Sequence, residues 1–299
     1  MHTNLSHRLK RTLLATAIVS SLSGYLHADI LIGKDINSNV GPNETINVLY
    51  SANRGSNGGG DQSQQLGDML YGTDSDDIII GGLGIDIIWG KAGDDVLIGG
   101  TEDFNPLNRD RAFGGEGEDI FIWAPGDGND AFDGGHGIDV VMLGLVGENK
   151  NAQNETEGAP FFAVSPPGSA GAGDFDGIYL DSNEQPLVSI EAAPGFCDIV
   201  EQDETNSEAL QALEIDHLVR FILRGNRSSF LASQETDTPL SDDGLRIALH
   251  LKNVEFLVCG GVEAGTRKVF DLSVTPAVEV DSSLLPVKAQ AIINGAAAL

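Results

Sequence analysis

A nine-residue period in the first half of the chain constrains its fold more than any other feature. Each block of nine has glycine or another turn-forming residue early, aspartate sixth and an apolar residue eighth. A flexible glycine-rich linker would lack the apolar eighth position, so the period predicts a folded repeat. The blocks in register are GTDSDDIII (72–80), GGLGIDIIW (81–89), GKAGDDVLI (90–98), GGEGEDIFI (114–122), PGDGNDAFD (125–133) and GGHGIDVVM (134–142).

Two insertions interrupt the array. Residues 99–113 end in Asp110-Arg-Ala-Phe and fit one further repeat that carries six extra residues. Residues 123–124 are a two-residue insertion. With the interrupted repeat included, seven aspartates stand in phase: Asp77, Asp86, Asp95, Asp110, Asp119, Asp130 and Asp139.

This pattern resembles the RTX, or haemolysin-type, calcium-binding nonapeptide GGxGxDxUx. The resemblance covers about a quarter of the chain. It implies an all-β fold, a parallel β-roll in which each nonapeptide supplies a six-residue turn and a very short strand. It also implies Ca²⁺ as the bound ion, held by the sixth-position aspartates and by carbonyls of positions one to four. The metal ligands implied are therefore the seven aspartates together with Gly72, Asp74, Gly81, Gly82, Gly84, Gly90, Gly93, Gly114, Gly115, Gly117, Gly134, Gly135 and Gly137.

The physical chemistry of the residues agrees with a roll. Early glycines permit positive φ, so carbonyl oxygens can point at a common centre. Position eight faces inward and positions seven and nine face outward, because side chains alternate along a strand. Such short strands bury little, and unscreened rows of aspartates repel each other. Calcium takes six to eight oxygen ligands, so we expect its binding and the folding of the roll to be coupled.

Successive repeats alternate between the two edges of such a roll. One edge would carry Asp77, Asp95, Asp119 and Asp139, and the other Asp86, Asp110 and Asp130. Ions between neighbouring turns then give three calcium positions on the first edge and two on the second. The two insertions weaken this expectation beside Asp110 and Asp130, and the contiguous block 72–98 is its strongest part.

The charge of the chain excludes some partners. It has 45 acidic and 17 basic side chains and a formal charge of −28. Nucleic acids and anionic membrane surfaces both require a basic footprint, so neither is an expected partner. A compact state with this charge repels itself unless counterions neutralise it. Solubility alone would also account for the acid, but the phased aspartates favour a metal site.

Residues 1–28 are predicted to be a secretory signal peptide. Basic residues Arg8, Lys10 and Arg11 precede an apolar run over 13–22, and Ala28 is a small residue at the predicted cleavage site. The alternative is an uncleaved anchor. No other segment approaches the 18 apolar residues of a transmembrane helix, so none is expected in the mature chain. The predicted location is secreted, extracellular or at the cell surface, with the periplasm as the alternative.

The chain after residue 28 divides into five predicted segments. We expect N-terminal cap strands and a loop over 29–65, the roll over 66–145, a linker or long loop over 146–177, a β-rich region that caps the roll over 178–275, and a loosely helical tail over 276–299. The motifs at 29–33, 47–50 and 68–72 are either early coils of the same solenoid or ordinary strand–turn sequence. Cys197 and Cys259 either form one disulfide or are two buried thiols.

Catalytic motifs are absent from the sequence. It contains neither HExxH nor GxSxG, and His217 and His250 lie in strand-like runs. The sequence therefore favours a non-enzymatic calcium-binding protein with a structural, adhesive or matrix role. The alternative is a secreted protein that binds or modifies polysaccharide, in which the roll is a stabiliser and the partner is a cell-surface or matrix polysaccharide.

Overall fold

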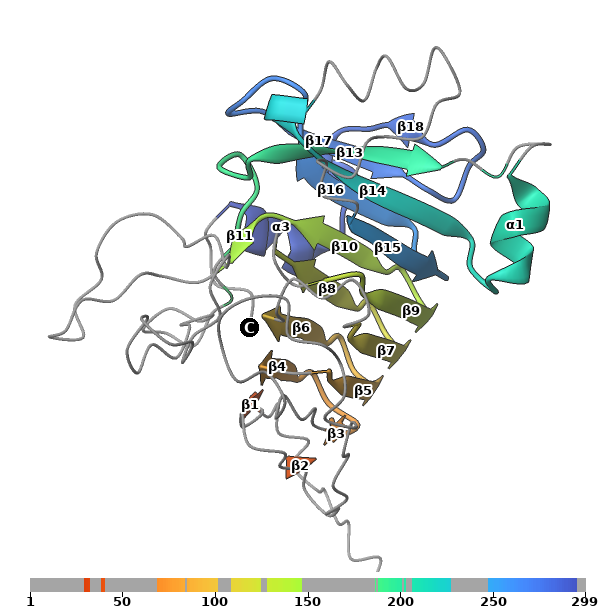
Figure 1. Cartoon of the computed structure of the whole chain (residues 1–299). Coiled ribbons are helices and arrows are strands. Elements are labelled where there is room, and N and C mark those ends of the chain that lie inside the picture. The colour runs from red at the N-terminus through yellow and green to blue at the C-terminus, as the bar shows by residue number, and fades with distance from the viewer. Residues whose placement is uncertain are drawn as a thin grey trace, which may run out of the picture.

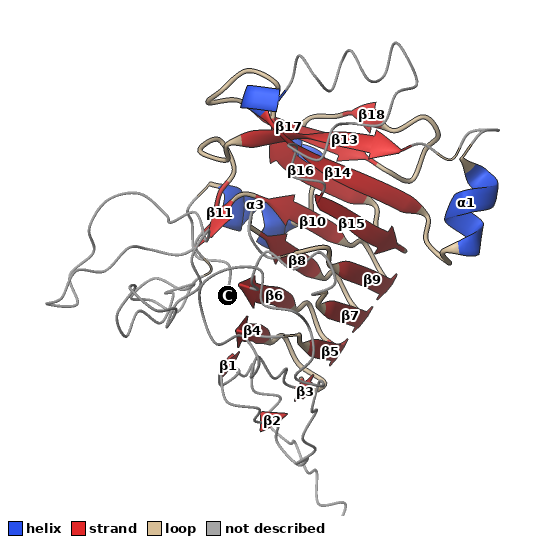
Figure 2. Cartoon of the chain, in the orientation of Figure 1, coloured by secondary structure: helices blue, strands red, loops and turns tan. Residues whose placement is uncertain are grey.

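A computed structural model describes residues 30–32, 39–40, 69–146 (except 84, 102–108 and 125–127), 186–226 (except 187, 201 and 203–205) and 247–294. The predicted signal peptide, the motif at 47–50 and nearly all of the linker at 146–177 lie outside the described residues. Within them the chain is almost entirely β structure (Figure 2).

Strands of the repeats alternate between two sheets. The first sheet receives β4 (Ile78–Leu83), β6 (Val96–Thr101), β8 (Ile120–Trp123) and β10 (Val140–Leu143). The second receives β5 (Ile87–Ala92), β7 (Arg111–Glu116) and β9 (Ala131–His136). Each strand pairs in parallel with the next strand of its own sheet, so the chain winds as the predicted parallel β-roll (Figure 1).

Most of these strands are longer than the very short strands expected from the repeat. β4, β5, β6, β7 and β9 each run for six residues, because the pairing continues into the first residues of the following turn. Gly82 pairs with Gly100, for example, and Gly115 pairs with Gly135. Part of each turn therefore contributes to the parallel ladder as well as to the edge of the roll.

The interior of the roll is built from the eighth positions, as the period predicts. These side chains are all buried, at 0 or 1% exposure: Ile79, Ile88, Leu97, Phe121, Phe132 and Val141, with Ala112 from the interrupted repeat. Each large apolar side chain buried in this way contributes about 1.5–3 kcal/mol. The packing of this single row fixes the register of both sheets, because a one-residue slip would turn it outward.

N-terminal strands extend the roll at its open end. β1 (Ile30–Ile32) pairs in parallel with β4 in the first sheet. β3 (Met69–Tyr71) pairs in parallel with β5, and β2 (Asn39–Val40) with β3, in the second sheet. Two of the three flanking motifs thus lie at strands of the solenoid itself.

A further coil at the other end comes from a distant part of the sequence. β15 (Ile247–Lys252) pairs in parallel with β9, and β16 (Phe256–Gly260) pairs in parallel with β10. Antiparallel strands then complete the sheets: β14 (His217–Leu223) and β13 (Gly195–Val200) in the second, β17 (Arg267–Asp271) and β18 (Val278–Glu279) in the first. The change from parallel to antiparallel pairing ends the solenoid (Figure 1).

Short elements complete the C-terminal region. They are β11 (Leu145–Val146) paired with β12 (Val188–Ser189), helix α1 (Ser207–Ala212), the 3-10 turns η2 (Arg224–Asn226) and η3 (Ser282–Leu284), and helix α3 (Val287–Ile293). A disulfide joins Cys197 in β13 to Cys259 in β16, with Cα atoms 6.2 Å apart. It links the second sheet to the first where the roll ends.

The predicted tail forms an ordered cover. Leu285, Ala289 and Ile292 are buried against the outer face of the first sheet. The outward positions seven and nine of that sheet are consequently buried rather than exposed: Ile78, Ile80, Val96, Ile98, Ile120, Ile122, Val140 and Met142. Among the residues that the structure describes, no helix is long and apolar enough to cross a membrane.

Candidate metal centre

The seven phased aspartates lie at the two edges of the roll, each directly before a strand. All seven are fully buried at 0% exposure. We call the turns that lead into the first sheet the first edge (72–77, 90–95, 114–119 and 134–139). Those that lead into the second sheet are the second edge (81–86, 99–110 and 125–130). A buried carboxylate costs several kcal/mol unless hydrogen bonds or a cation compensate it, so the contacts of these side chains decide what the edges do.

Aspartates of the first edge form a continuous row. The backbone N–H of Asp77 donates to Oδ1 of Asp95 at 2.7 Å, that of Asp95 to Oδ1 of Asp119 at 2.9 Å, and that of Asp119 to Oδ1 of Asp139 at 2.9 Å. At the open end Asp77 instead bonds within its own turn, where the N–H of Thr73 donates to Asp77 Oδ2 at 2.5 Å. The carboxylates of Asp95, Asp119 and Asp139 therefore each use one oxygen to accept a hydrogen bond from the preceding coil.

The second edge repeats this pairing in spite of the insertions. The N–H of Asp86 donates to Oδ1 of Asp110 at 2.7 Å, and the N–H of Asp110 donates to Oδ1 of Asp130 at 2.9 Å. The structure thus separates the seven aspartates into the same two rows that the alternation of repeats predicts. The six extra residues are accommodated without displacing Asp110 from its row.

The first-position glycines stand beside these carboxylates. A Cβ atom on Gly72, Gly81, Gly90, Gly114 or Gly134 would come closer than 3.0 Å to the Oδ2 atom of that repeat's own aspartate. It would also come closer than 3.0 Å to a carbonyl oxygen of the next coil, which belongs to the first-position glycine in four cases and to Asn253 in the case of Gly134. A carboxylate and a carbonyl oxygen therefore converge on one small space, which only glycine leaves open.

Glycines at positions two and four allow positive φ and close stacking of the coils. Gly115 and Gly135 at position two, and Gly93, Gly117 and Gly137 at position four, all have positive φ. The coils are so tightly stacked there that a side chain would collide with the backbone of the preceding coil.

Four other residues occupy positions two to four of these turns. Lys91 holds position two with φ 88°, a conformation that costs a non-glycine residue on the order of 1–3 kcal/mol. Asp74 is exposed. Gly84 lies outside the described residues, and Gly82 is described only by its strand pairing.

One oxygen of each later carboxylate in the first edge has no hydrogen-bond partner within the described part of the chain. These atoms are Oδ2 of Asp95, Asp119 and Asp139. Burial raises the pKa of Asp95 to about 9, with the neighbouring Asp119 and Asp77 charges adding to the rise. Burial likewise raises the pKa of Asp119 to about 7 and that of Asp139 to about 8. Without a cation, burial therefore shifts each of these groups towards its protonated form.

A second row of acidic residues, which the sequence analysis did not single out, borders the first edge. Fifth-position Asp76 accepts the N–H of Asp94 at 2.9 Å, and Asp94 accepts the N–H of Glu118 at 2.8 Å. Lys288 of helix α3 bonds to Asp76 Oδ2 at 3.0 Å and also to the carbonyl oxygen of Asp94. The fifth positions therefore add charge to the first edge, and the C-terminal helix brings a fixed cation to it.

Residues 71–103 match the RTX calcium-binding nonapeptide repeat, in four copies. The chain carries RTX repeats. Neither the comparison with curated proteins nor the comparison with solved structures gave a match. RTX repeats bind Ca²⁺, so this is a calcium-binding protein built on a β-roll.

The donor set of the RTX turns fits calcium. Paired carboxylates and convergent carbonyl oxygens are the hard oxygen ligands that calcium prefers. Among the described residues no three His, Cys, Asp or Glu side chains gather as one metal-binding group, so an ion here would depend on backbone carbonyls as well. The unpartnered Oδ2 atoms of the first edge are where such an ion would compensate buried charge.

Two further residues at the RTX edges escaped the sequence analysis. Gly99, the first residue of the interrupted repeat, stands against Asp110 Oδ2 as the other first-position glycines do against theirs. Glu255 accepts the N–H of Asp139 at 2.8 Å and so continues the first-edge row beyond the repeats. The sequence does contain a signal for Glu255. The run Glu255-Phe-Leu-Val has an acidic residue with an apolar residue two positions later, as the motifs at 29–33 and 68–72 do.

The three histidines among the described residues lie apart from the RTX turns or on their surface. His217 is buried at the start of β14, and His250 lies in β15 with its Nδ1 atom 3.5 Å from Arg109. Burial and the Arg109 charge lower the pKa of His250. His136 is exposed, with its Nε2 atom 3.9 Å from Glu116.

Proposed function

We propose that the chain is a secreted, non-enzymatic protein in which calcium ions bind between stacked turns of the roll and drive its folding. The seven aspartates and the turn residues at positions one to four, Asp74 and the glycines included, would supply the ligands. The observation that carries this proposal is the row of buried Oδ2 atoms at Asp95, Asp119 and Asp139. Coordination of a divalent cation would offset both the desolvation cost and the mutual repulsion that otherwise raise the pKa values of these carboxyls.

Export would bring the roll to the calcium concentration that it needs. Extracellular calcium modules typically bind with dissociation constants of about 10⁻⁴–10⁻³ M, far above cytosolic calcium levels. The signal-like residues 1–28 and the disulfide between Cys197 and Cys259 both favour an oxidising compartment outside the cytosol. In this setting a roll that folds on arrival is suited to a structural, adhesive or matrix role.

Calorimetric calcium titration of the full chain tests the proposal. We expect several calcium ions per chain and fewer in each of the variants Asp86→Ala and Asp95→Ala, because each substitution removes a carboxylate between stacked turns. Glu279→Ala, which removes an acid in β18 that pairs with Lys268, is the control and should retain the full number. Unchanged stoichiometry in both aspartate variants would refute the assigned ligands.

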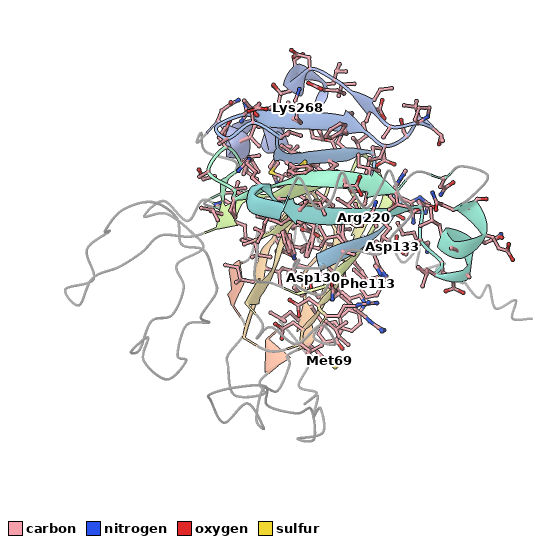
Figure 3. The ribbon with its side chains drawn as sticks, turned by 45° about the horizontal axis from the view of Figure 1, so that its top comes forward. Met69, Phe113, Asp130, Asp133, Arg220 and Lys268 are labelled. Atoms are coloured by element: carbon pink, nitrogen blue, oxygen red, sulfur yellow. A yellow bond between two sulfur atoms is a disulfide. The ribbon has the colours of Figure 1, made fainter. Side chains whose placement is uncertain are left out.

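Polysaccharide binding is a second candidate, and the outer face of the second sheet favours it. Tyr71, Trp89 and Phe113 stack along this face, with ring centroids 4.7 and 5.9 Å apart. Lys91 lies over the Tyr71 ring, and Arg111 is exposed with no acidic partner among the described residues. Phe113 and Met69, labelled in Figure 3, belong to this face. The three aromatic side chains and the two cations, without Met69, are called the aromatic row: Tyr71, Trp89, Lys91, Arg111 and Phe113.

The composition of the aromatic row points to an acidic polysaccharide. The ring faces are largely occupied by one another, so ring edges and the two cations are what a ligand would meet. In a chain of formal charge −28 this local positive charge would attract a polyanion. Retention on immobilised polygalacturonate, compared with neutral dextran, tests it. Arg111→Gln and Trp89→Ala should weaken retention on the acidic matrix alone, and equal retention of both variants would exclude the aromatic row.

A further inference from the structure

The first-edge row of carboxylates does not end with the last repeat. Val140 of β10 lies opposite Phe256 of β16, so Glu255 precedes β16 as Asp139 precedes β10. The N–H of Asp139 donates to Oε2 of Glu255 at 2.8 Å. This is the same bond that each earlier aspartate of the row makes to the next, at 2.7–2.9 Å.

A carbonyl oxygen also lies beside the carboxylate between Asp139 and Glu255, as it does between the earlier pairs of the row. A Cβ on Gly134 would come closer than 3.0 Å both to Asp139 Oδ2 and to the carbonyl oxygen of Asn253. Asn253 thus replaces the first-position carbonyl of a following repeat. Its backbone N–H donates to Asp216 at 2.8 Å and its side chain to Asp133 at 2.7 Å, and these two bonds fix the direction of its carbonyl.

Asp139 supplies an independent sign that a ligand belongs here. Its side chain is fully buried, and its Oδ2 atom has no hydrogen-bond partner within the described residues. The turn before β16 has only three residues, 253–255, whereas the corresponding turn of the preceding coil has six, 134–139. The glutamate side chain, one methylene longer than aspartate, reaches the row across this shorter turn.

We propose that Asp139, Glu255 and the carbonyl of Asn253 form a further calcium position that joins the last repeat to the C-terminal coil. This inference rests on the proposed function and extends it beyond the nonapeptides. The short turn offers fewer carbonyls than a repeat does, so this position binds more weakly and fills after those inside the array. Calcium then docks the β15–β16 coil on the roll, and closure of the C-terminal cap becomes calcium-dependent.

Calcium stoichiometry of the full chain provides the first test. Glu255→Gln keeps an acceptor for the Asp139 N–H but removes the charge, so we expect it to bind one calcium ion fewer than the native chain. Glu263→Gln makes the same change in an exposed turn of the C-terminal region and should bind the native number. A native number in Glu255→Gln overturns the inference. A native chain that binds no calcium would instead refute the proposed function.

Hydrogen exchange in the native chain provides a second test that does not depend on a variant folding. Titration with calcium should slow exchange in two steps, first in the turns of the repeats and then at the amides of Asp139, Glu255 and Phe256, which bond across this step. If the repeats gain protection while these three amides exchange equally with and without calcium, the C-terminal coil docks without the ion and the inference is wrong.

Discussion

At the first edge of the roll the fifth position is acidic in three turns, Asp76, Asp94 and Glu118, and apolar in the fourth, Ile138, whereas at the second edge it is Ile85, Arg109 and Asn129. Both edges hold their sixth-position aspartates fully buried and bonded from coil to coil. The first row continues into Glu255, but the second ends where Leu249 lies opposite Asp130. The same backbone repeat thus carries a dense, extended acidic row at one edge and a short, partly neutralised row at the other.

This difference teaches that the aspartate alone does not set the need for a cation. Charge repulsion adds over neighbours at short range, so the flanking fifth positions increase the free-energy cost of a calcium-free first edge. At the second edge Arg109 precedes Asp110 in the chain, with its guanidinium 3.5 Å from His250, and brings positive charge to this edge without an ion. We therefore expect the first edge to dominate calcium binding, and the following substitutions and conditions test that expectation.

Removal of a central carboxylate should have the largest effect. Asp119 lies between two neighbours of the first row and Asp110 between two of the second. We expect Asp119→Ala to raise the calcium concentration at the folding midpoint about tenfold, or about 1.4 kcal/mol, and Asp110→Ala to raise it less. Fluorescence-detected calcium titrations of the two variants measure this directly. An equal or larger shift in Asp110→Ala would reverse the ranking of the edges.

Filling a first-position space should be the next largest effect. The Cβ of Gly114→Ala would collide with Asp119 Oδ2 and with the carbonyl oxygen of Gly134. We expect it to destabilise the calcium-bound roll by about 2–3 kcal/mol. Gly225→Ala is the matched control, since nothing lies within 4 Å of its added Cβ. Thermal unfolding in calcium separates them, and similar melting temperatures would show that the space at Gly114 is not needed.

The stability of the fold should fall as the pH rises in the calcium-free state and stay nearly constant in the calcium-bound state. Burial holds the pKa values of Asp95, Asp119 and Asp139 at about 9, 7 and 8, above the ordinary value of 3.8. The calcium-free folded chain therefore binds more protons than the unfolded chain, and its stability falls as pH rises from about 4 towards 9. Calcium displaces these protons, so its affinity should rise over the same range.

Melting temperatures with calcium and with chelator, measured from pH 5 to pH 9, give the difference between the two states. We expect this difference to widen as the pH rises. A difference that is constant across the range would mean that the buried carboxyls do not titrate with folding.

Loss of the lysine at the first edge should have the smallest effect. Lys288→Ala removes the ion pair with Asp76, which is half exposed, so we expect a loss of about 1 kcal/mol or less. The loss should be greater without calcium, when Lys288 is the fixed cation at this edge. Lys268→Ala, which breaks the exposed pair with Glu279, is the control and should respond to calcium no differently from the native chain.

The sequence predicts the roll well because each position of its period has a local structural role that recurs in every repeat. Glycine at positions two and four, aspartate at six and an apolar residue at eight each act within one or two coils, so the spacing, together with the resemblance to RTX repeats, predicts both rows. The buried outer face of the first sheet was not predicted, since it depends on Ala289 and Ile292, which follow the array by about 150 residues.

The same reason explains why part of the candidate site was missed. Glu255 joins the first row only because β16 pairs with β10, a contact between residues 116 apart. No period links the two positions, and the three-residue turn before Glu255 lacks the glycines that mark a repeat. β13 and β17 lie within the predicted β-rich region, but their antiparallel pairing with β14 and β16 was not predicted, because no period in the sequence marks it.

Far-ultraviolet circular dichroism of the full chain, first in chelator and then across a calcium titration, tests the central claim most directly. We predict that chelation lowers the β signal, that millimolar calcium restores it, and that equal magnesium does not, because magnesium requires a smaller octahedral shell. An identical spectrum with and without calcium would contradict the coupling of calcium binding to folding of the roll.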